Sequence, residues 1–323
     1  MSDAARYTLR TTCRTCGSTE LLSVLNLGSP VLSDFVQPGQ PDPPRVPLDL
    51  VICDVCQLVQ LRHTTASDLL YRNYWYRSGV NETMRAELSD IVKQATLLAG
   101  GLTSRDVVID IGANDGTLLS NYDSGASRPW RVAYEPALNL NDTLRPHADA
   151  LIADFFPKGM NEVTALRSEV AICTSIAMFY DLDEPSAFVE AIDYLLADRG
   201  VWVVQMQELG QMVRATAYDN ICHEHLAYYS LTTFERLLRP YNLAVSMVET
   251  RAINGGSLRF YVQRRSRAAA LPICAADVAK ARQAEAWLDY AALERFAWRV
   301  GKHTERLVGT IDFDAIRQAL IAD

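Results

Sequence analysis

The sequence lacks the features that mark a membrane-bound or exported protein. Its 323 residues contain no apolar run near the roughly 20 residues of a membrane span. Residues 1–25 hold no long apolar stretch followed by a small-residue cleavage site. These absences predict a cytoplasmic protein without a membrane partner, and the 49% hydrophobic content is enough for a buried core.

An excess of basic residues is also missing. The chain has 31 Lys and Arg against 39 Asp and Glu, which gives a net charge of -8. A protein that neutralises many backbone phosphates needs a basic surface, and the composition as a whole opposes one. The charge therefore predicts that nucleic acid is not a partner.

Cysteine is present in an odd number, seven, which argues against a disulfide framework. Four of the cysteines form two Cys-x-x-Cys pairs, joined by a segment rich in Pro and Gly that is too poor in apolar residues to fold alone. Four thiolates suit a tetrahedral Zn²⁺ with no open position for chemistry, so a structural zinc site is predicted; chance reduced thiols are the alternative. The predicted ligands are Cys13, Cys16, Cys53 and Cys56.

The chain divides into three predicted segments: a zinc-binding domain over 1–62, an α/β domain over 63–265 and a helical tail over 266–323. In the middle segment, apolar strand-like runs alternate with helix-like stretches such as Phe188–Leu196, which is typical of a parallel sheet wrapped by helices. Leu258–Gln263 fits a closing strand, for which an antiparallel orientation is one option. The other predicted strands are Val107–Ile111, Arg131–Tyr134, Val170–Cys173 and Val201–Gln205.

The most informative local pattern is a strand, a glycine turn and a helix start. Gly112 and Gly116 permit a tight turn and close approach of a ligand to the backbone. Asn114 replaces the middle glycine of a dinucleotide-binding turn. Asp110 and Asp115 place negative charge where a pyrophosphate would lie. The turn instead suits S-adenosylmethionine, whose ammonium and sulfonium groups are cationic.

Acidic residues at the ends of the next two strands support this interpretation. Glu135 stands nineteen residues after Gly116, where a carboxylate can accept both ribose hydroxyls. Asp154 could bond the adenine amino group, beside an aromatic wall that begins at Phe155. The alternative is that each acid caps a helix or lies in water.

Further motifs give the chain a family resemblance. They are the paired cysteines, the glycine turn, Tyr74–Gly79 with Asn81–Met84, and Cys222–His225 followed by Tyr228–Ser230. Over about residues 10–265 the chain resembles the S-adenosylmethionine-dependent sugar C-methyltransferases that carry an N-terminal zinc-binding domain. The resemblance implies a class I methyltransferase, Rossmann-like sheet.

The same resemblance implies a reaction, namely methylation of a carbon next to the ketone of a nucleotide-linked 4-keto deoxysugar. His225 would be the base that forms an enolate, and Glu224 its partner or a ligand of the sugar. His223 belongs to the same candidate catalytic set, and Tyr76 would lie near the reacting centre. The alternatives are a polar loop or an adventitious metal site for the histidines, and simple packing for Tyr76.

Members of this family usually continue into a second sheet domain, which this sequence does not show. We therefore expect either that a partner subunit supplies the missing surface or that the substrate does not need it. Three other functions stay open: O-methylation of a small molecule, methylation of RNA by a zinc-bearing enzyme, and a non-catalytic scaffold. The acidic charge opposes the RNA enzyme, and the cofactor turn and the His-Glu-His run oppose the scaffold.

Overall fold

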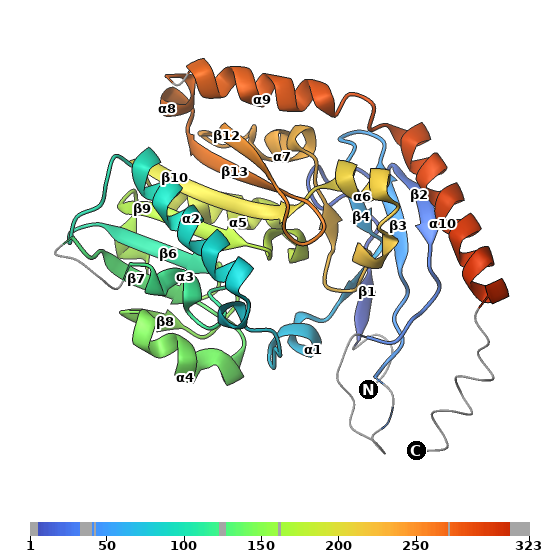
Figure 1. Ribbon diagram of the computed structural model, residues 1–323, viewed down its shortest axis with the longest axis horizontal. Coiled ribbons are helices and arrows are strands. Elements are labelled where there is room, and N and C mark those ends of the chain that lie inside the picture. Colours follow the sequence, from blue (N-terminus) through green and yellow to red (C-terminus); the bar gives the residue numbers. More distant parts are fainter. Residues whose placement is uncertain are drawn as a thin grey trace.

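The molecule combines a large mixed sheet with a smaller N-terminal sheet, as Figure 1 shows. A computed structural model describes residues 6–32, 41, 43–122, 127–160, 163–270 and 272–310. The large sheet has seven strands in the order β12-β13-β10-β9-β6-β7-β8. Its strands are β6 (Val107–Ile111), β7 (Trp130–Tyr134), β8 (Ala150–Ile152), β9 (Val170–Ile176), β10 (Leu196–Gln207), β12 (Leu243–Arg251) and β13 (Ser257–Arg264).

Strands β6 to β10 run parallel, whereas β13 pairs antiparallel with β10 and β12 pairs antiparallel with β13. The predicted Rossmann-like class is confirmed, and the closing strand expected near Leu258 is antiparallel. Strand β12 was not foreseen from the sequence. Because parallel strands share a direction, the carboxyl ends of β6 to β10 meet at one edge of the sheet.

Helices cover both faces of the large sheet. Along β6, Val108 packs with residues of α2 (Glu82–Leu98) such as Ile91, while the adjacent Ile109 packs on the other face with Phe188 of α5 (Pro185–Leu195). Successive side chains of a strand point to opposite faces, and both faces are buried here, which is why every residue of this run except Asp110 is apolar. The remaining helices of the middle segment are α1 (Ser67–Tyr71), α3 (Thr117–Ser120), α4 (Asn141–Leu144), α6 (Leu209–Ala215) and α7 (Leu231–Leu238).

The N-terminal sheet is completed by a strand from far along the chain. Its order is β11-β4-β3-β2, in which β11 (Ala227–Tyr228) pairs antiparallel with β4 (Val59–Leu61). A second, two-stranded sheet joins β1 (Tyr7–Leu9) to β5 (His63–Thr65). The other two strands are β2 (Leu21–Asn26) and β3 (Asp49–Cys53).

Three helices follow the large sheet: α8 (Arg265–Ala269), α9 (Pro272–Ala284) and α10 (Tyr290–Thr310). They run along the top and the right-hand edge of the molecule (Figure 1). Phe296 of α10 shares a core with Leu50 and Ile52 of β3 and with Met212 of α6. The N-terminal strands thus obtain from other segments the apolar partners that they lack. The rest of the predicted tail, residues 311–323, lies outside the described residues.

Within the described part of the chain, no helix has the length and apolarity needed to span a membrane.

Candidate active site and metal centre

The turn after β6 has the backbone that its glycines predict. Gly112 and Gly116 have φ values of 73° and 82°, in the left-handed region, and Asn114 lies there too at 53°. A Cβ on Gly112 would come within 3.1 Å of Met178, and one on Gly116 within 3.0 Å of His147. The turn therefore has no room for a larger residue and leaves its backbone open to a ligand.

Glu135 lies at the end of β7, beside this turn. Its Oε2 accepts the Asn114 N–H at 2.6 Å and its Oε1 accepts the Ala137 N–H at 2.8 Å, so the carboxylate fixes two loops at once. Burial raises the pKa of Glu135, and these backbone hydrogen bonds oppose the shift. Each oxygen keeps a further lone pair, which suits a ligand with two hydroxyl donors.

Asp110 is almost fully buried within β6. Thr174 donates its hydroxyl to Asp110 Oδ1 at 2.5 Å. Burial raises the pKa of Asp110 to about 7, against the effect of the Thr174 hydrogen bond. This side chain contributes to the wall of the site next to Gly112.

The side chains of Asn114 and Asp115 hold the segment that precedes α2. Asn114 accepts the Ser78 N–H at 2.9 Å and donates to the Tyr76 carbonyl at 3.1 Å. Asp115 accepts the Gly79 N–H at 2.9 Å and the Thr117 hydroxyl at 2.6 Å. These two residues thus keep Tyr76 against the cofactor turn, a long-range role that the sequence did not indicate.

Asp154 and Phe155 follow β8 at the same edge of the sheet. Asp154 accepts the Phe155 N–H at 2.8 Å and lies 3.4 Å from Arg72. The guanidinium of Arg72 lies 4.9 Å from the centre of the Phe155 ring, and the ring of Tyr71 meets Phe155 edge-on at 6.3 Å. Asp154 and Phe155 thus place a carboxylate and an aromatic ring at one position, and Arg72 contacts both of them.

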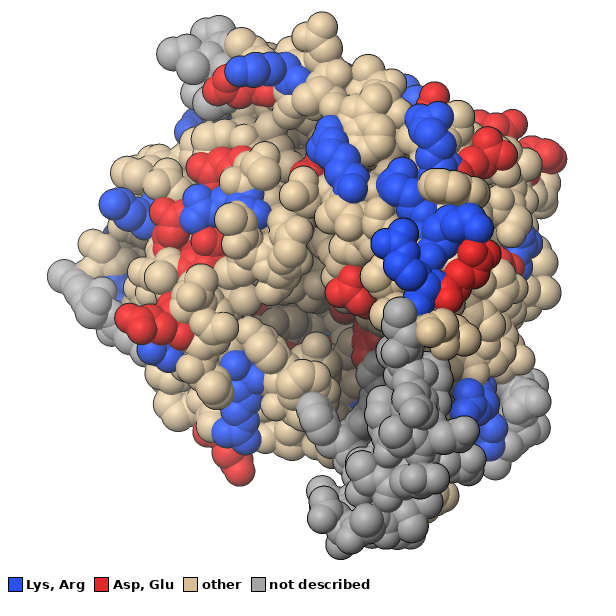
Figure 2. Space-filling view, turned by 45° about the vertical axis from the view of Figure 1, so that its right-hand side comes forward, with Lys and Arg blue, Asp and Glu red and all other residues tan. Residues whose placement is uncertain are grey.

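Most of these groups line one cleft of about 710 Å³, whereas the predicted cofactor residues Asp115 and Gly116 are not among its lining residues. One wall comes from the carboxyl ends of the parallel strands, and the other from the N-terminal segment, including Tyr7, Thr64 and Ser67. Figure 2 shows a hollow at the centre of this face, with Asp and Glu side chains at its edge. The predicted residues on the cleft are Tyr76, Asp110, Gly112, Asn114, Glu135, Asp154, Phe155 and Glu224.

The His-Glu-His run is split among three environments. His223 is buried away from the cleft, and its Nε2 lies 2.9 Å from the Val46 carbonyl oxygen. Glu224 lines the large cleft. His225 lines an adjoining cavity of about 200 Å³, which shares Tyr180 and Asn254 with the cleft. In the sequence, the three residues form one candidate catalytic set. In the structure, His223 instead contacts the N-terminal segment.

His225 is held in a defined orientation. Its Nδ1 lies 2.9 Å from the Asn220 carbonyl oxygen, and its ring meets that of Tyr180 at 4.3 Å between centroids. A carbonyl oxygen only accepts, so Nδ1 carries the hydrogen and Nε2 keeps a free lone pair. Burial lowers the pKa of His225 and so favours the neutral ring. A neutral ring with an unprotonated nitrogen can accept a proton.

Sequence reasoning missed an acid beside Glu224. Asp181 ends the 3₁₀ helix η7 (Phe179–Asp181), which follows β9, and lines the same cleft. Like Glu135 and Asp154, Asp181 follows a parallel strand, and this position could have predicted from the sequence that it lies at the site. Tyr71 and Tyr180 also line this end of the cleft.

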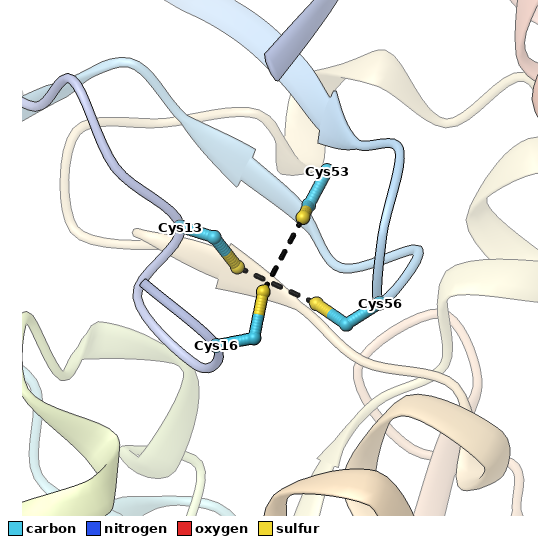
Figure 3. A group of neighbouring side chains, drawn as sticks. All are labelled: Cys13, Cys16, Cys53 and Cys56. Atoms are coloured by element: carbon cyan, nitrogen blue, oxygen red, sulfur yellow. Dashed lines mark hydrogen bonds between the residues drawn. The ribbon is translucent and has the colours of Figure 1, made fainter. Parts of the chain in front are cut away.

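The four paired cysteines form a single cluster. Figure 3 shows their sulfur atoms pointing toward one another from two separate turns. Cys13 and Cys56 Sγ lie 3.4 Å apart, Cys16 and Cys53 Sγ lie 3.5 Å apart, and all four Sγ atoms fall within 4.8 Å of one another. A tetrahedral Zn²⁺ with bonds of about 2.3 Å needs sulfurs about 3.8 Å apart, so the residues fit the metal.

Comparison with known families agrees with this architecture. Residues 80–247, more than half of the chain, match the family described as "Methyltransferase domain". Residues 13–71 match the family described as "Putative zinc binding domain". The chain therefore belongs to the S-adenosylmethionine-dependent methyltransferases, with a zinc-binding domain at its N-terminal end.

Among curated proteins, the chain is similar to the C-methyltransferase NovU of Streptomyces niveus. The two are 28% identical over 254 residues, which cover 76% of this chain and 59% of NovU. The chain thus spans about three-fifths of the length of this relative.

Solved structures also match. One is the magnesium protoporphyrin IX methyltransferase of Synechocystis PCC 6803 with bound SAH, at a TM-score of 0.43 and 11% identity, covering 57% of this chain and 88% of that one. Another is a protein of Pyrococcus horikoshii OT3, at a TM-score of 0.45 and 10% identity, covering 59% of this chain and 95% of that one.

Proposed function

We propose that this protein transfers a methyl group from S-adenosylmethionine to a carbon next to the ketone of a nucleotide-linked 4-keto deoxysugar. The single observation that carries the proposal is His225, whose Nδ1 is anchored on the Asn220 carbonyl in the cavity that adjoins the large cleft. The name of the similar C-methyltransferase supports transfer to carbon.

The cofactor occupies the part of the cleft nearest β6 in this proposal. Gly112 lines the cleft and allows it to approach the backbone, Gly116 gives the turn its left-handed φ, and Glu135 accepts its ribose hydroxyls. Asp154 and Phe155 receive the adenine ring. The cofactor supplies an electrophilic methyl group on its sulfonium, and the remaining task of the chain is to make the substrate carbon nucleophilic.

A proton next to a ketone is weakly acidic, so its removal needs a base and help for the developing enolate oxygen. His225 Nε2 is the base in this proposal, and the reacting end of the sugar extends toward the cavity behind Tyr180. Glu224 lines the large cleft rather than the cavity of His225, and it serves as a ligand of the sugar.

The four cysteines bind a structural Zn²⁺ in this proposal, because a closed set of four thiolates leaves no coordination position for substrate. The nucleotide of the substrate lies along the wall formed by Tyr7, Thr64 and Ser67, where hydroxyl groups line the cleft. A further partner subunit would enlarge this wall.

The test is incubation with S-adenosylmethionine and a panel of nucleotide-linked 4-keto deoxysugars in heavy water. We expect exchange of a proton next to the ketone without the cofactor, and methylation of the same carbon with it. A His225→Asn variant should lose both. His303→Asn is the matched control, because His303 is exposed on α10. Methylation only on oxygen, or full activity of His225→Asn, would contradict the proposal.

A further inference from the structure

Two carboxylate oxygens at one end of the cleft have no partner. Asp181 Oδ1 and Glu224 Oε2 are buried atoms without a hydrogen bond among the described residues. Both residues line the cleft beside Tyr180, whose ring contacts His225. A buried oxygen without a hydrogen bond destabilises the fold unless a ligand or a bound proton compensates for it. The two oxygens therefore indicate a contact with the substrate.

The surroundings of Asp181 favour its neutral form. Burial, and after it the proximity of Glu224, raise the pKa of Asp181 well above its usual range, while the nearby Tyr71 hydroxyl opposes the shift. A carboxyl group that is buried beside another acid takes up a proton more readily than one in water. The titratable groups facing the pair from neighbouring elements are Tyr71, Tyr74, Tyr180, Cys222, His225 and Tyr228.

We infer that Asp181 is a further catalytic residue, whose carboxylic acid O–H donates a hydrogen bond to the ketone oxygen of the substrate. This inference rests on the proposed function and names the group that stabilises the enolate. A carboxylic acid kept neutral by its surroundings can serve as such a donor.

The proton balance is simple. His225 takes the proton from the carbon, and the electron pair of that C–H bond delocalises onto the ketone oxygen. Asp181 keeps its own proton throughout and stabilises the oxygen by a short charge-assisted hydrogen bond. The charge on the oxygen disappears when the carbon forms its new bond to the methyl group. The S–CH3 bond of the cofactor breaks in the same step, its electron pair stays on sulfur, and S-adenosylhomocysteine leaves. His225 later releases its proton to water.

Two substitutions of Asp181 separate a donor from an anionic ligand. Asp181→Asn keeps an N–H donor of similar shape, so we expect proton exchange within about 10-fold of the wild-type rate. Asp181→Ala removes the donor, and the rate should fall about 100-fold or more. Asp142→Asn, on the exposed side of α4, is the matched control and should exchange at the wild-type rate.

The pH profile adds a readout that a purely structural role would not change. In the wild type, exchange should decline at high pH as Asp181 ionises, whereas Asp181→Asn has no proton to lose there and should keep its rate. This comparison uses the wild type and Asp181→Asn, so it tests the inference even where Asp181→Ala fails to fold. The inference would be overturned if the Asn and Ala variants lost the same fraction of the exchange rate. It would also be overturned if the rate of Asp181→Asn declined at high pH as that of the wild type does.

Infrared difference spectroscopy tests the proton on Asp181 without any substrate. The spectrum of the wild type minus that of Asp181→Asn at neutral pH should contain the carbonyl stretch of a protonated carboxylic acid. Absence of that band overturns the inference whatever the enzyme methylates. Failure of the wild type to exchange any 4-keto sugar, with the band present, overturns the proposed function while the protonated acid stands.

Discussion

Removal of the metal from the four-cysteine cluster should unfold the N-terminal strands before the large sheet. Cys13, Cys53 and Cys56 are buried and belong to the same apolar core as Leu58, so the cluster sits inside the packing that it supports. A four-cysteine zinc site contributes about 10–16 kcal/mol in small zinc-binding peptides. Whole domains are stable by only about 5–15 kcal/mol, so losing the metal is enough to unfold this segment.

The sharpest variant is Cys16→Ser. Cys16 is the exposed member of the cluster, so its replacement removes a ligand with little loss of core packing. We expect about one zinc per chain in the wild type and a large loss of bound zinc in this variant. Cys222→Ser is the matched control, because this thiol lies outside the cluster and its loss should leave the zinc content unchanged.

Hydrogen exchange locates the effect. In the wild type, a strong chelator should accelerate amide exchange in β3 and β4 first, and in Cys16→Ser the chelator should add nothing. The large sheet should keep its protection in both. Zinc-free protein with full protection of β3 and β4 would refute the reasoning, because the cluster would then be dispensable for folding.

Four further outcomes are expected. Glu135→Ala should weaken binding of S-adenosylmethionine about 10-fold or more by calorimetry, because each hydrogen bond to a charged group contributes about 1.5–3 kcal/mol. Gly116→Val should lower the melting temperature and abolish that binding, because φ is 82° and the new Cβ meets His147. Arg259→Met should destabilise the fold by about 3–5 kcal/mol in urea titration, because Arg259 is fully buried among Glu87, Asp90 and Glu249. Burial lowers the pKa of His225 below the ordinary histidine value of about 6.5, so the base form persists at that pH. The rate of proton exchange should therefore begin to fall only at a pH below about 6.5.

The cofactor turn could be predicted from the sequence because its determinants are local. The apolar run Val107–Ile111 coincides with β6, and Gly112 and Gly116 have the positive φ that motivated their interpretation. The position of Glu135 followed from one further step, since successive parallel strands end at the same edge of the sheet. Strand and turn patterns of this kind need no knowledge of distant contacts.

Other parts of the site depend on contacts that no local pattern contains. Asn114 and Asp115 hydrogen-bond to residues 36 positions earlier in the chain. His223 bonds to Val46, 177 positions away. Contacts between residues so far apart leave no local pattern in the sequence, which explains why the sequence grouped His223 with His225 as one candidate catalytic unit.

These distant contacts also give the N-terminal segment a part in the geometry of the site. The loop that carries His225 is held at the Leu226 carbonyl by the Leu61 N–H at 2.9 Å, and at the Glu224 carbonyl by the Tyr71 hydroxyl at 3.2 Å. The antiparallel pairing of β11 with β4 also holds the end of this loop to the N-terminal sheet. Strand β4 follows directly after the turn of Cys53 and Cys56. We therefore expect a metal that orders this turn to act on the orientation of His225 through the backbone, although the metal and His225 lie in different parts of the fold.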